Sequence, residues 1–516
     1  MKIILVRPPR YLWPVVNESD NYMLPLGLPC LASTIREKLP HVQIKIIDCP
    51  PLKIGWKTLE GMLRQEKPDV IGAGEEALYH HEAVRLFKLA KDINPKAITI
   101  AGGHFFSWTP EESLTKYPID YIVRFEGEYT FVELLEAIQG GKDISKVRGI
   151  SYKKGDRVIN NPLRPLIHNL DELPLPAYDL MPMKSYSPSG YFWPQGATIE
   201  HSRGCVDSCS FCSLWTFWGK HIKTDAERGE LEAQPKYRSK SVDRTLEEID
   251  LLYNKYNRRY LLWADPTFNT DPKWSDEFCE KLLKKKYKDL YWWAFLRADF
   301  ILRDERLGIF EKMVKAGLIN AFIGVEREHD ADFKDLHKCY QKEVCREVFR
   351  ILKQKYPGVH RQGTFLTGVR KEDKTSLLSL VDYALDIGVE FMMFHPITPV
   401  PGTKLYQEAV QKGWLSVKDF RCYDWLQPVM ATEHLSLDEI TRLTKAASLK
   451  FILRRWPVAL QGLFSRFRYR RKLYWWFMSI FAKGFLQDIK EILINKKGPK
   501  GLKRVLYLTK PCWYDN

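Results

Sequence analysis

Short apolar runs and amphipathic stretches alternate over the first 140 residues of the chain. The apolar runs have the length and composition of buried strands, and they fall at residues 3–6, 43–47, 70–73, 98–101 and 121–123. Stretches between them, such as residues 29–38 and 81–91, repeat apolar residues at helical spacing. Strands that alternate with helices are typical of a parallel sheet covered by helices. The pattern therefore predicts an α/β domain with a doubly wound parallel sheet over residues 1–140.

Polar turns follow two of these predicted strands. Gly102-Gly103-His104 comes directly after the fourth strand, and Glu126-Gly127-Glu128 follows the fifth. Open α/β sheets bind ligands at the carboxyl ends of their strands. We therefore predict a ligand site at this edge of the sheet.

A second series of strands and helices occupies residues 197–410. Its strands are predicted at residues 197–201, 260–264, 292–296, 321–325, 364–368 and 391–396. Six strand–helix units predict a partial (β/α)6 barrel over residues 196–425. Residues 141–195 hold closely spaced prolines and are predicted to form an extended linker, because proline disfavours helix. Residues 426–516 are predicted to form a helical, basic region.

The composition is that of an ordinary globular protein, with 45% hydrophobic and 28% charged residues. No apolar stretch approaches the length of a membrane-spanning helix, and no secretory signal follows Met1. Ten cysteines without a disulfide-like pattern indicate a reducing compartment. We expect a cytoplasmic protein, with peripheral association at the inner membrane surface as an extension of that expectation.

The positive charge is concentrated at the end of the chain. Residues 450–516 contain nine Lys and seven Arg against three acidic residues, which accounts for +13 of the net charge of +16. Aromatic residues interleave with these bases at residues 451–456 and 464–477. This mixture is typical of a helix on an anionic membrane surface, of nucleic-acid contact, or of a cap whose aromatics pack on the barrel. We expect a membrane surface or a cap, and nucleic acid is the least favoured partner.

Three cysteines directly after the first barrel strand carry the strongest chemical signal. Cys205, Cys209 and Cys212 are spaced C-x3-C-x2-C, and thiolates are ligands of iron–sulfur clusters. A [4Fe–4S] cluster held by three cysteines leaves one iron free for another ligand. A structural zinc site would need a fourth ligand; His201 is near, but this is not a usual zinc spacing. The other seven cysteines are isolated and fit ordinary core positions.

This motif, with Phe211 before its last cysteine, resembles the signature of the radical SAM enzymes. In that family the free iron binds S-adenosylmethionine, which the reduced cluster cleaves to a 5′-deoxyadenosyl radical. The resemblance implies polar contacts to S-adenosylmethionine at the carboxyl ends of later strands, where Asp265, Arg297 and Glu326 lie. The chain departs from the family at two points, since it lacks the common Gly-Gly-Glu run near Asp265 and has Arg327 where Ser is frequent. A plain salt bridge is the alternative role for each of the three residues.

The resemblance extends over nearly the whole chain to the cobalamin-binding radical SAM family, especially the anaerobic magnesium-protoporphyrin IX monomethyl ester cyclase-like branch. It implies that the N-terminal sheet binds cobalamin through Gly102-Gly103-His104 and Glu126-Gly127-Glu128. The Asp-x-His-x-x-Gly stretch that supplies a cobalt-ligating histidine in methionine synthase-like proteins is missing. We therefore expect no histidine of that motif on the cobalt. A sheet that has lost cobalamin binding is the alternative.

The same resemblance implies an enzyme that removes hydrogen from an unactivated carbon and then methylates or oxidatively cyclises a large apolar substrate, such as a lipid or a tetrapyrrole. It also implies an external electron donor such as flavodoxin or ferredoxin. A radical SAM enzyme without cobalamin and a non-catalytic membrane-associated binding protein are the alternatives. A tRNA methylthiotransferase would need a second cysteine trio in the N-terminal region, where only Cys30 and Cys49 occur.

Overall fold

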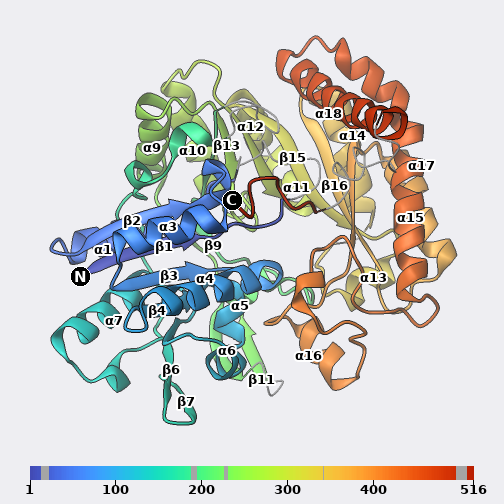
Figure 1. Cartoon of the computed structure of the whole chain (residues 1–516). Coiled ribbons are helices and arrows are strands. Elements are labelled where there is room, and N and C mark those ends of the chain that lie inside the picture. Colours follow the sequence, from blue (N-terminus) through green and yellow to red (C-terminus); the bar gives the residue numbers. More distant parts are fainter. Residues whose placement is uncertain (13–22, 187–194, 226–229, 341, 495–507) are drawn as a thin grey trace.

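Two α/β units and a pair of long C-terminal helices make up the chain (Figure 1). The computed structural model describes residues 1–12, 23–186, 195–225, 230–340, 342–494 and 508–516. Figure 1 shows the C-terminal helices against the second unit, at its end away from the N-terminal sheet.

The N-terminal unit is built on a seven-stranded sheet of order β2-β1-β3-β4-β5-β6-β7. Its five parallel strands are β1 (Lys2–Arg7), β2 (Gln43–Asp48), β3 (Val70–Gly74), β4 (Ile98–Gly102) and β5 (Tyr121–Val123). The hairpin of β6 (Ile150–Lys154) and β7 (Arg157–Asn160) continues the sheet in antiparallel fashion. The parallel part agrees with the prediction, whereas the hairpin lies in residues predicted to be an extended linker.

Helices cover both faces of this sheet because its strands bury alternate residues on opposite sides. Ile3 and Leu5 belong to the core under α1 (Gly27–Lys38) and α7 (Glu128–Gly140). Ile4 and Val6 belong to the core under α3 (Trp56–Glu66) and α4 (His80–Ile93). The shorter helices are α2 (Cys49–Leu52), α5 (Gly103–Trp108) and α6 (Pro110–Lys116). The unit is therefore doubly wound, as the sequence predicts.

The second unit is a six-stranded parallel sheet of order β17-β16-β15-β14-β13-β8, the predicted partial barrel. Its strands are β8 (Gly196–Ile199), β13 (Tyr260–Trp263), β14 (Tyr291–Leu296), β15 (Leu318–Glu326), β16 (His360–Thr367) and β17 (Phe391–Pro396). Its helices are α9 (Val242–Asp250), α10 (Pro272–Lys284), α11 (Ala298–Arg306), α12 (Ile309–Lys315), α13 (Asp330–Asp335), α14 (Lys342–Lys355), α15 (Lys374–Ile387) and α16 (Lys404–Gln411). In β14, Trp292 and Ala294 pack outward into the main core, whereas Trp293 and Phe295 lie on the inner face.

A polar insertion follows β8 and carries the cysteine motif. It begins with β9 (Ser202–Arg203), which pairs with β12 (Arg238–Ser239). Between them lie α8 (Ser213–Phe217) and the hairpin of β10 (Lys220–Asp225) and β11 (Glu230–Gln234).

The C-terminal helices α17 (Leu437–Leu463) and α18 (Arg468–Leu493) pack on the second unit. A capping box between Ser436 and Glu439 starts α17. Tyr469, Leu473 and Phe477 of α18 join the aromatic cluster on the inner face of the barrel strands. The first half of α18 therefore caps the barrel, which is one of the alternatives considered for the basic region. Of the helices in the described residues, none combines the length and apolarity needed to span a bilayer.

The last described residues return to the N-terminal unit. Trp56 N–H donates to the carbonyl oxygen of Tyr514 (3.0 Å), and Tyr514 Oη donates to Glu82 Oε1 (2.7 Å). Gly55 lies so close to this segment that a Cβ there would collide with the Trp513 carbonyl oxygen. Residues 508–516 thus complete the packing of α3 and α4.

Candidate cofactor site

The three motif cysteines lie in one loop that other parts of the chain hold in place. Gly204 enters this loop with a φ of +85°, and a Cβ there would collide with the Lys236 carbonyl oxygen. Ser210 N–H donates to the Leu336 carbonyl oxygen (3.0 Å), and Trp215 Nε1 donates to the Cys209 carbonyl oxygen (2.8 Å). The loop follows β8, at the end of the barrel where such folds place their chemistry.

The thiols of this loop fit a metal cluster. Burial raises the pKa of the Cys209 thiol, and it raises that of Cys212 to about 11, although the Leu214 N–H lowers the latter in part. Iron would stabilise these thiolates, because the cations offset the cost of burying negative charge. Within the described residues, no three His, Cys, Asp or Glu side chains converge on one point as the ligands of a single metal ion do. Each cysteine of a [4Fe–4S] cluster binds a different iron.

Arg297, predicted to contact a cofactor, reaches the cysteine loop. Its Nη1 lies 2.7 Å from Oδ2 of Asp207, which stands between Cys205 and Cys209. Its other nitrogens donate to Asp299 at 2.6 and 2.9 Å. Both Arg297 and Asp207 are largely buried, so the pair fixes the middle of the loop. Nothing in the motif pattern marked Asp207 for this contact.

Asp265 supports the start of the same loop. Its Oδ1 accepts hydrogen bonds from the Ser202 N–H (2.6 Å) and the Ser202 hydroxyl (2.5 Å), and it lies 2.7 Å from His201 Nδ1. The carboxylate is fully buried. These contacts give Asp265 a positioning role, and its predicted contact with S-adenosylmethionine stays a prediction.

Glu326 lies at the end of β15 on the inner face of the barrel. Its φ is +63°, and its Oε1 accepts a hydrogen bond from Lys338 Nζ at 2.7 Å. Lys338 also donates to the Gly324 carbonyl oxygen (2.8 Å), and its charge opposes the rise in pKa that burial causes at Cys209. The structure thus places Glu326 and Lys338 beside the cysteine loop. Lys338 escaped the sequence analysis because it lies outside any motif.

The Glu126-Gly127-Glu128 turn faces the second unit. Arg203 Nη2 donates to Glu128 Oε1 (2.6 Å), and Arg203 Nη1 donates to Glu126 Oε1 (3.1 Å). Arg238 Nη1 also donates to Glu126, at 2.9 and 3.0 Å. All four side chains are buried. The two carboxylates join the N-terminal sheet to the residues before the first cysteine, and their predicted contact with cobalamin stays a prediction.

Gly102-Gly103-His104 lies at the carboxyl edge of the N-terminal sheet, where the backbone approaches β3 closely. Gly103 has a φ of +81°, and a Cβ there would lie 3.0 Å from the Glu75 nitrogen. His104 stacks on Phe217 of α8, with ring centroids 3.9 Å apart, and burial lowers its pKa to about 4.

A cofactor with many amide groups fits this edge. Glu75 is buried beside Gly103, burial raises its pKa to about 7, and its Oε1 has no hydrogen-bond partner among the described residues. The side-chain amides of cobalamin could donate to that oxygen.

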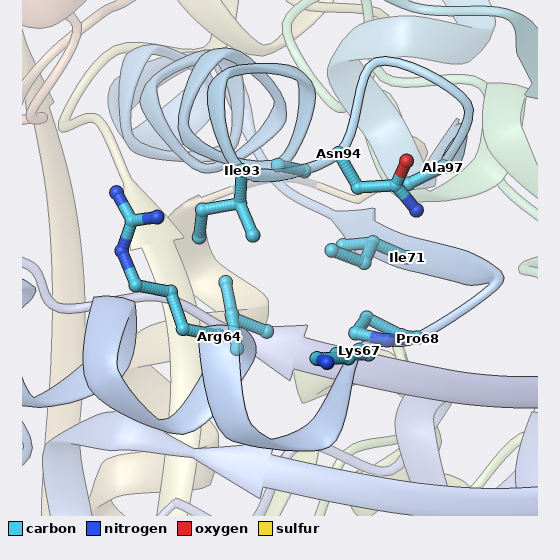
Figure 2. A pocket seen from close by; sticks show the side chains of 9 residues that line it. Arg64, Lys67, Pro68, Ile71, Ile93, Asn94 and Ala97 are labelled. Carbon is cyan, nitrogen blue, oxygen red and sulfur yellow. The ribbon is translucent and has the colours of Figure 1, made fainter.

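A cavity lies elsewhere, in the N-terminal unit. It measures about 310 Å³ and opens between α3 and α4, next to Ile71 and Ala97 (Figure 2). Pro68 and Ala97 precede β3 and β4, so this cavity is at the amino edge of the sheet. None of the predicted site residues lines it.

Comparison with known proteins agrees with this arrangement. The family model described as B12 binding domain matches residues 12–135, and that of the Radical SAM superfamily matches residues 199–384. The chain is 30% identical over 457 residues to the uncharacterized methyltransferase PH0819 of Pyrococcus horikoshii, covering 88% of this chain and 93% of that protein. It is 27% identical over 449 residues to the anaerobic magnesium-protoporphyrin IX monomethyl ester cyclase of Rubrivivax gelatinosus, covering 85% of this chain and 76% of that protein. The fold is similar to that of the cobalamin-dependent S-adenosylmethionine radical enzyme OxsB, with a TM-score of 0.68 and 19% sequence identity. The match covers 95% of this chain and 73% of the OxsB chain.

Proposed function

This chain belongs to the B12-binding radical SAM proteins, and we propose that it transfers a methyl group to an unactivated carbon of a large apolar substrate. Its cofactors are a [4Fe–4S] cluster, S-adenosylmethionine and cobalamin. When bound, they supply a 5′-deoxyadenosyl radical for hydrogen abstraction and a methyl group for the same carbon. The 30% sequence identity to an uncharacterized methyltransferase supports methyl transfer. The 27% sequence identity to the cyclase makes oxidative ring closure the second candidate.

The observation that carries the proposal is the ion-paired junction between the two units. Arg203, two residues before Cys205, is bound to Glu126 and Glu128 at the carboxyl edge of the N-terminal sheet. The edge that fits cobalamin and the loop that fits the cluster therefore adjoin. Methyl transfer to a carbon that has just lost hydrogen requires both groups near one substrate.

The residues of the loop and its neighbours have separable roles in this proposal. Cys205, Cys209 and Cys212 would hold the cluster, while Asp207 and Asp265 keep the loop in place. Glu326, next to Lys338, would accept hydrogen bonds from the amino group or ribose of S-adenosylmethionine. Strained backbone at Glu326, with its φ of +63°, is typical of residues held for a functional purpose.

The inner face of the barrel supports an apolar substrate. Phe295 and Phe322 lie on the same face as Glu326, and their ring centroids are 4.7 Å apart. Both side chains are only half-buried, as is Met393 on β17. Apolar side chains in this position would contact a hydrocarbon and exclude water, which protects a radical from unwanted reaction.

The test is anaerobic reconstitution with iron, sulfide and hydroxocobalamin, followed by turnover with dithionite in place of an external donor such as flavodoxin or ferredoxin. Lipid extracts and polar extracts are supplied as separate substrate pools. We expect about four irons and one cobalamin per chain, and 5′-deoxyadenosine formation stimulated by the lipid pool. Mass spectrometry should then find a product with one additional methyl group.

Other results would change the proposal in defined ways. A product that has lost two hydrogens without gaining carbon would favour ring closure. Four irons without bound cobalamin would contradict methyl transfer. Stimulation by the polar pool alone would contradict an apolar substrate. The Cys209→Ala variant is the negative control for all radical chemistry.

A further inference from the structure

A row of apolar side chains on α17 is exposed to solvent. Its members follow one helix face at spacings of three and four residues, and they are Leu449 (57% exposed), Ile452 (44%), Leu453 (66%), Trp456 (48%) and Leu460 (41%). We call these five residues the α17 stripe. A helix in a globular protein ordinarily turns such a stripe toward the core.

The buried face of α17 is a different one. Ile440, Thr444, Ala447 and Phe451 are buried at spacings of three and four residues, and α17 contacts α15 and β17. At 100° per residue this buried row lies about half a turn away from the α17 stripe. The stripe therefore points away from the protein.

The exposed apolar surface continues beyond the end of α17. Phe464, between the two helices, is 81% exposed, and on α18 Trp475 and Leu486 are 57% and 63% exposed. The helices pack closely enough that a Cβ at Gly462 would collide with the Tyr474 ring. The two helices thus form one packed pair. Within the described part of the chain, no other segment covers the large apolar side chains that the pair exposes.

The charge of this helix pair is strongly one-sided. Exposed basic side chains border the apolar positions, and they are Arg454, Arg466, Arg468, Lys472, Lys483 and Lys490. The acidic residues of the two helices are Asp438 and Glu439 in the first turn of α17, Asp488, which is buried, and Glu491. The partner of this surface should therefore be both apolar and negatively charged.

We propose that α17 and α18 lie on the surface of an anionic lipid bilayer, with the α17 stripe inserted among the lipids. Trp and Phe beside Arg and Lys are typical of helices in the membrane interface. A second copy of this chain would bring two basic surfaces together, which like charges oppose. Nucleic acid would use aromatic stacking, yet four of the five residues in the stripe are aliphatic.

The experiment is vesicle flotation with the full-length reconstituted protein. Vesicles of phosphatidylcholine mixed with phosphatidylglycerol should carry the protein upward, and vesicles of phosphatidylcholine alone should bind it much more weakly. High salt should weaken binding to the mixed vesicles, because salt screens the attraction. The Leu453→Ser/Trp456→Ser variant should lose affinity for the mixed vesicles by about tenfold or more, since two large apolar side chains no longer enter the bilayer.

The matched control is Leu307→Ser, because Leu307 is a 59% exposed apolar residue after α11 on the barrel unit. It should bind vesicles as the wild type does. Equal binding by both variants, or no flotation of the wild type, would overturn the proposal. So would a dimer in light scattering that the double substitution dissociates, or retention on RNA in place of vesicles. The assay uses no substrate, so its result tests the membrane proposal independently of the proposed methyl transfer.

Discussion

Arg203 and Glu128 form a buried ion pair, 2.6 Å between Nη2 and Oε1, that links the cysteine loop to the first turn of α7. Burial disfavours the charge on Glu128, but Arg203 outweighs it and holds the pKa of that carboxyl below its ordinary value. The same guanidinium contacts Glu126 and Glu200, each at 3.1 Å. One side chain thus ties the predicted cluster loop to the predicted cobalamin edge.

Arg203→Gln should destabilise the protein by about 3–5 kcal/mol, because it leaves the buried Glu128 carboxylate without its ion-pair partner. Urea unfolding under anaerobic conditions at neutral pH measures this loss. Arg36→Gln removes an exposed ion pair with Asp179 and should cost less than about 1 kcal/mol. Similar losses in the two variants would show that the buried pair contributes no more than a surface pair.

Cys209→Ala should abolish the cluster, because two thiolates do not retain a [4Fe–4S] cluster. Bound iron should fall from about four atoms per chain to a small fraction of that amount. Iron analysis and the visible absorption spectrum after reconstitution measure the result. Cys422→Ala, a half-buried cysteine in the barrel unit outside the motif, should keep the full iron content. A full cluster in the Cys209 variant would refute the assignment of the ligands.

Asp207→Asn should leave the fold intact but make the cluster easier to remove. The substitution breaks the ion pair with Arg297 and frees the middle of the loop. We expect a chelator to extract iron several-fold faster, while the unfolding temperature changes little. Asp299→Asn affects the same guanidinium from outside the loop and should release iron at the wild-type rate. Unchanged iron release in the Asp207 variant would contradict the positioning role.

His104→Phe should make the free energy of unfolding less dependent on pH below pH 7. The folded-state pKa of His104 is about 4, well below the unfolded value of about 6.5. Between these values the unfolded chain binds the proton, so stability falls as pH decreases through this window. Phenylalanine retains the stacking on Phe217 and does not titrate. From pH 7 to pH 5 the wild type should lose about 1–2 kcal/mol more than the variant, and equal losses would contradict the burial of a neutral imidazole.

Gly103→Ala should destabilise the N-terminal unit by about 1–3 kcal/mol, because Gly103 combines a positive φ with close contact to Glu75. It should also weaken cobalamin binding, followed by absorption titration. Gly61→Ala lies in α3 with no atom within 4 Å of the new Cβ, so it should be neutral or stabilising. Tight cobalamin binding by the Gly103 variant would move the cobalamin site away from this edge.

Sequence periodicity located the parallel strands of both sheets because each of them is a short apolar run with strong turn signals on either side. Thus the run at residues 3–6 is the interior of β1, and that at residues 292–296 lies within β14. The cysteine motif was equally visible, since its spacing alone carries chemical meaning. The family resemblance that these features carry implied the three cofactors, and the comparisons confirm the family and the cofactors.

Contacts between distant segments could not be predicted in the same way. The pairing of Arg203 with Glu128 joins residues from separate units, and neither has a partner within its own motif. The β6–β7 hairpin was missed because it was grouped with the proline-rich residues that follow it from Pro162 onward. In α18, Tyr469, Leu473 and Phe477, each four residues apart, pack on the barrel, whereas Trp475 and Leu486 face the solvent. Composition alone could not separate such a cap from an exposed surface.

The return of residues 508–516 to the N-terminal unit has a consequence for biosynthesis. Tyr514 and Glu82, which share a hydrogen bond, are 432 residues apart in the sequence. At a synthesis rate of about 5–20 residues per second, roughly 20–90 s separate their emergence from the ribosome. During that interval α3 and α4 have an uncovered apolar flank around Trp56. Chaperone binding to the nascent chain should therefore concentrate there, on the first domain made rather than the last.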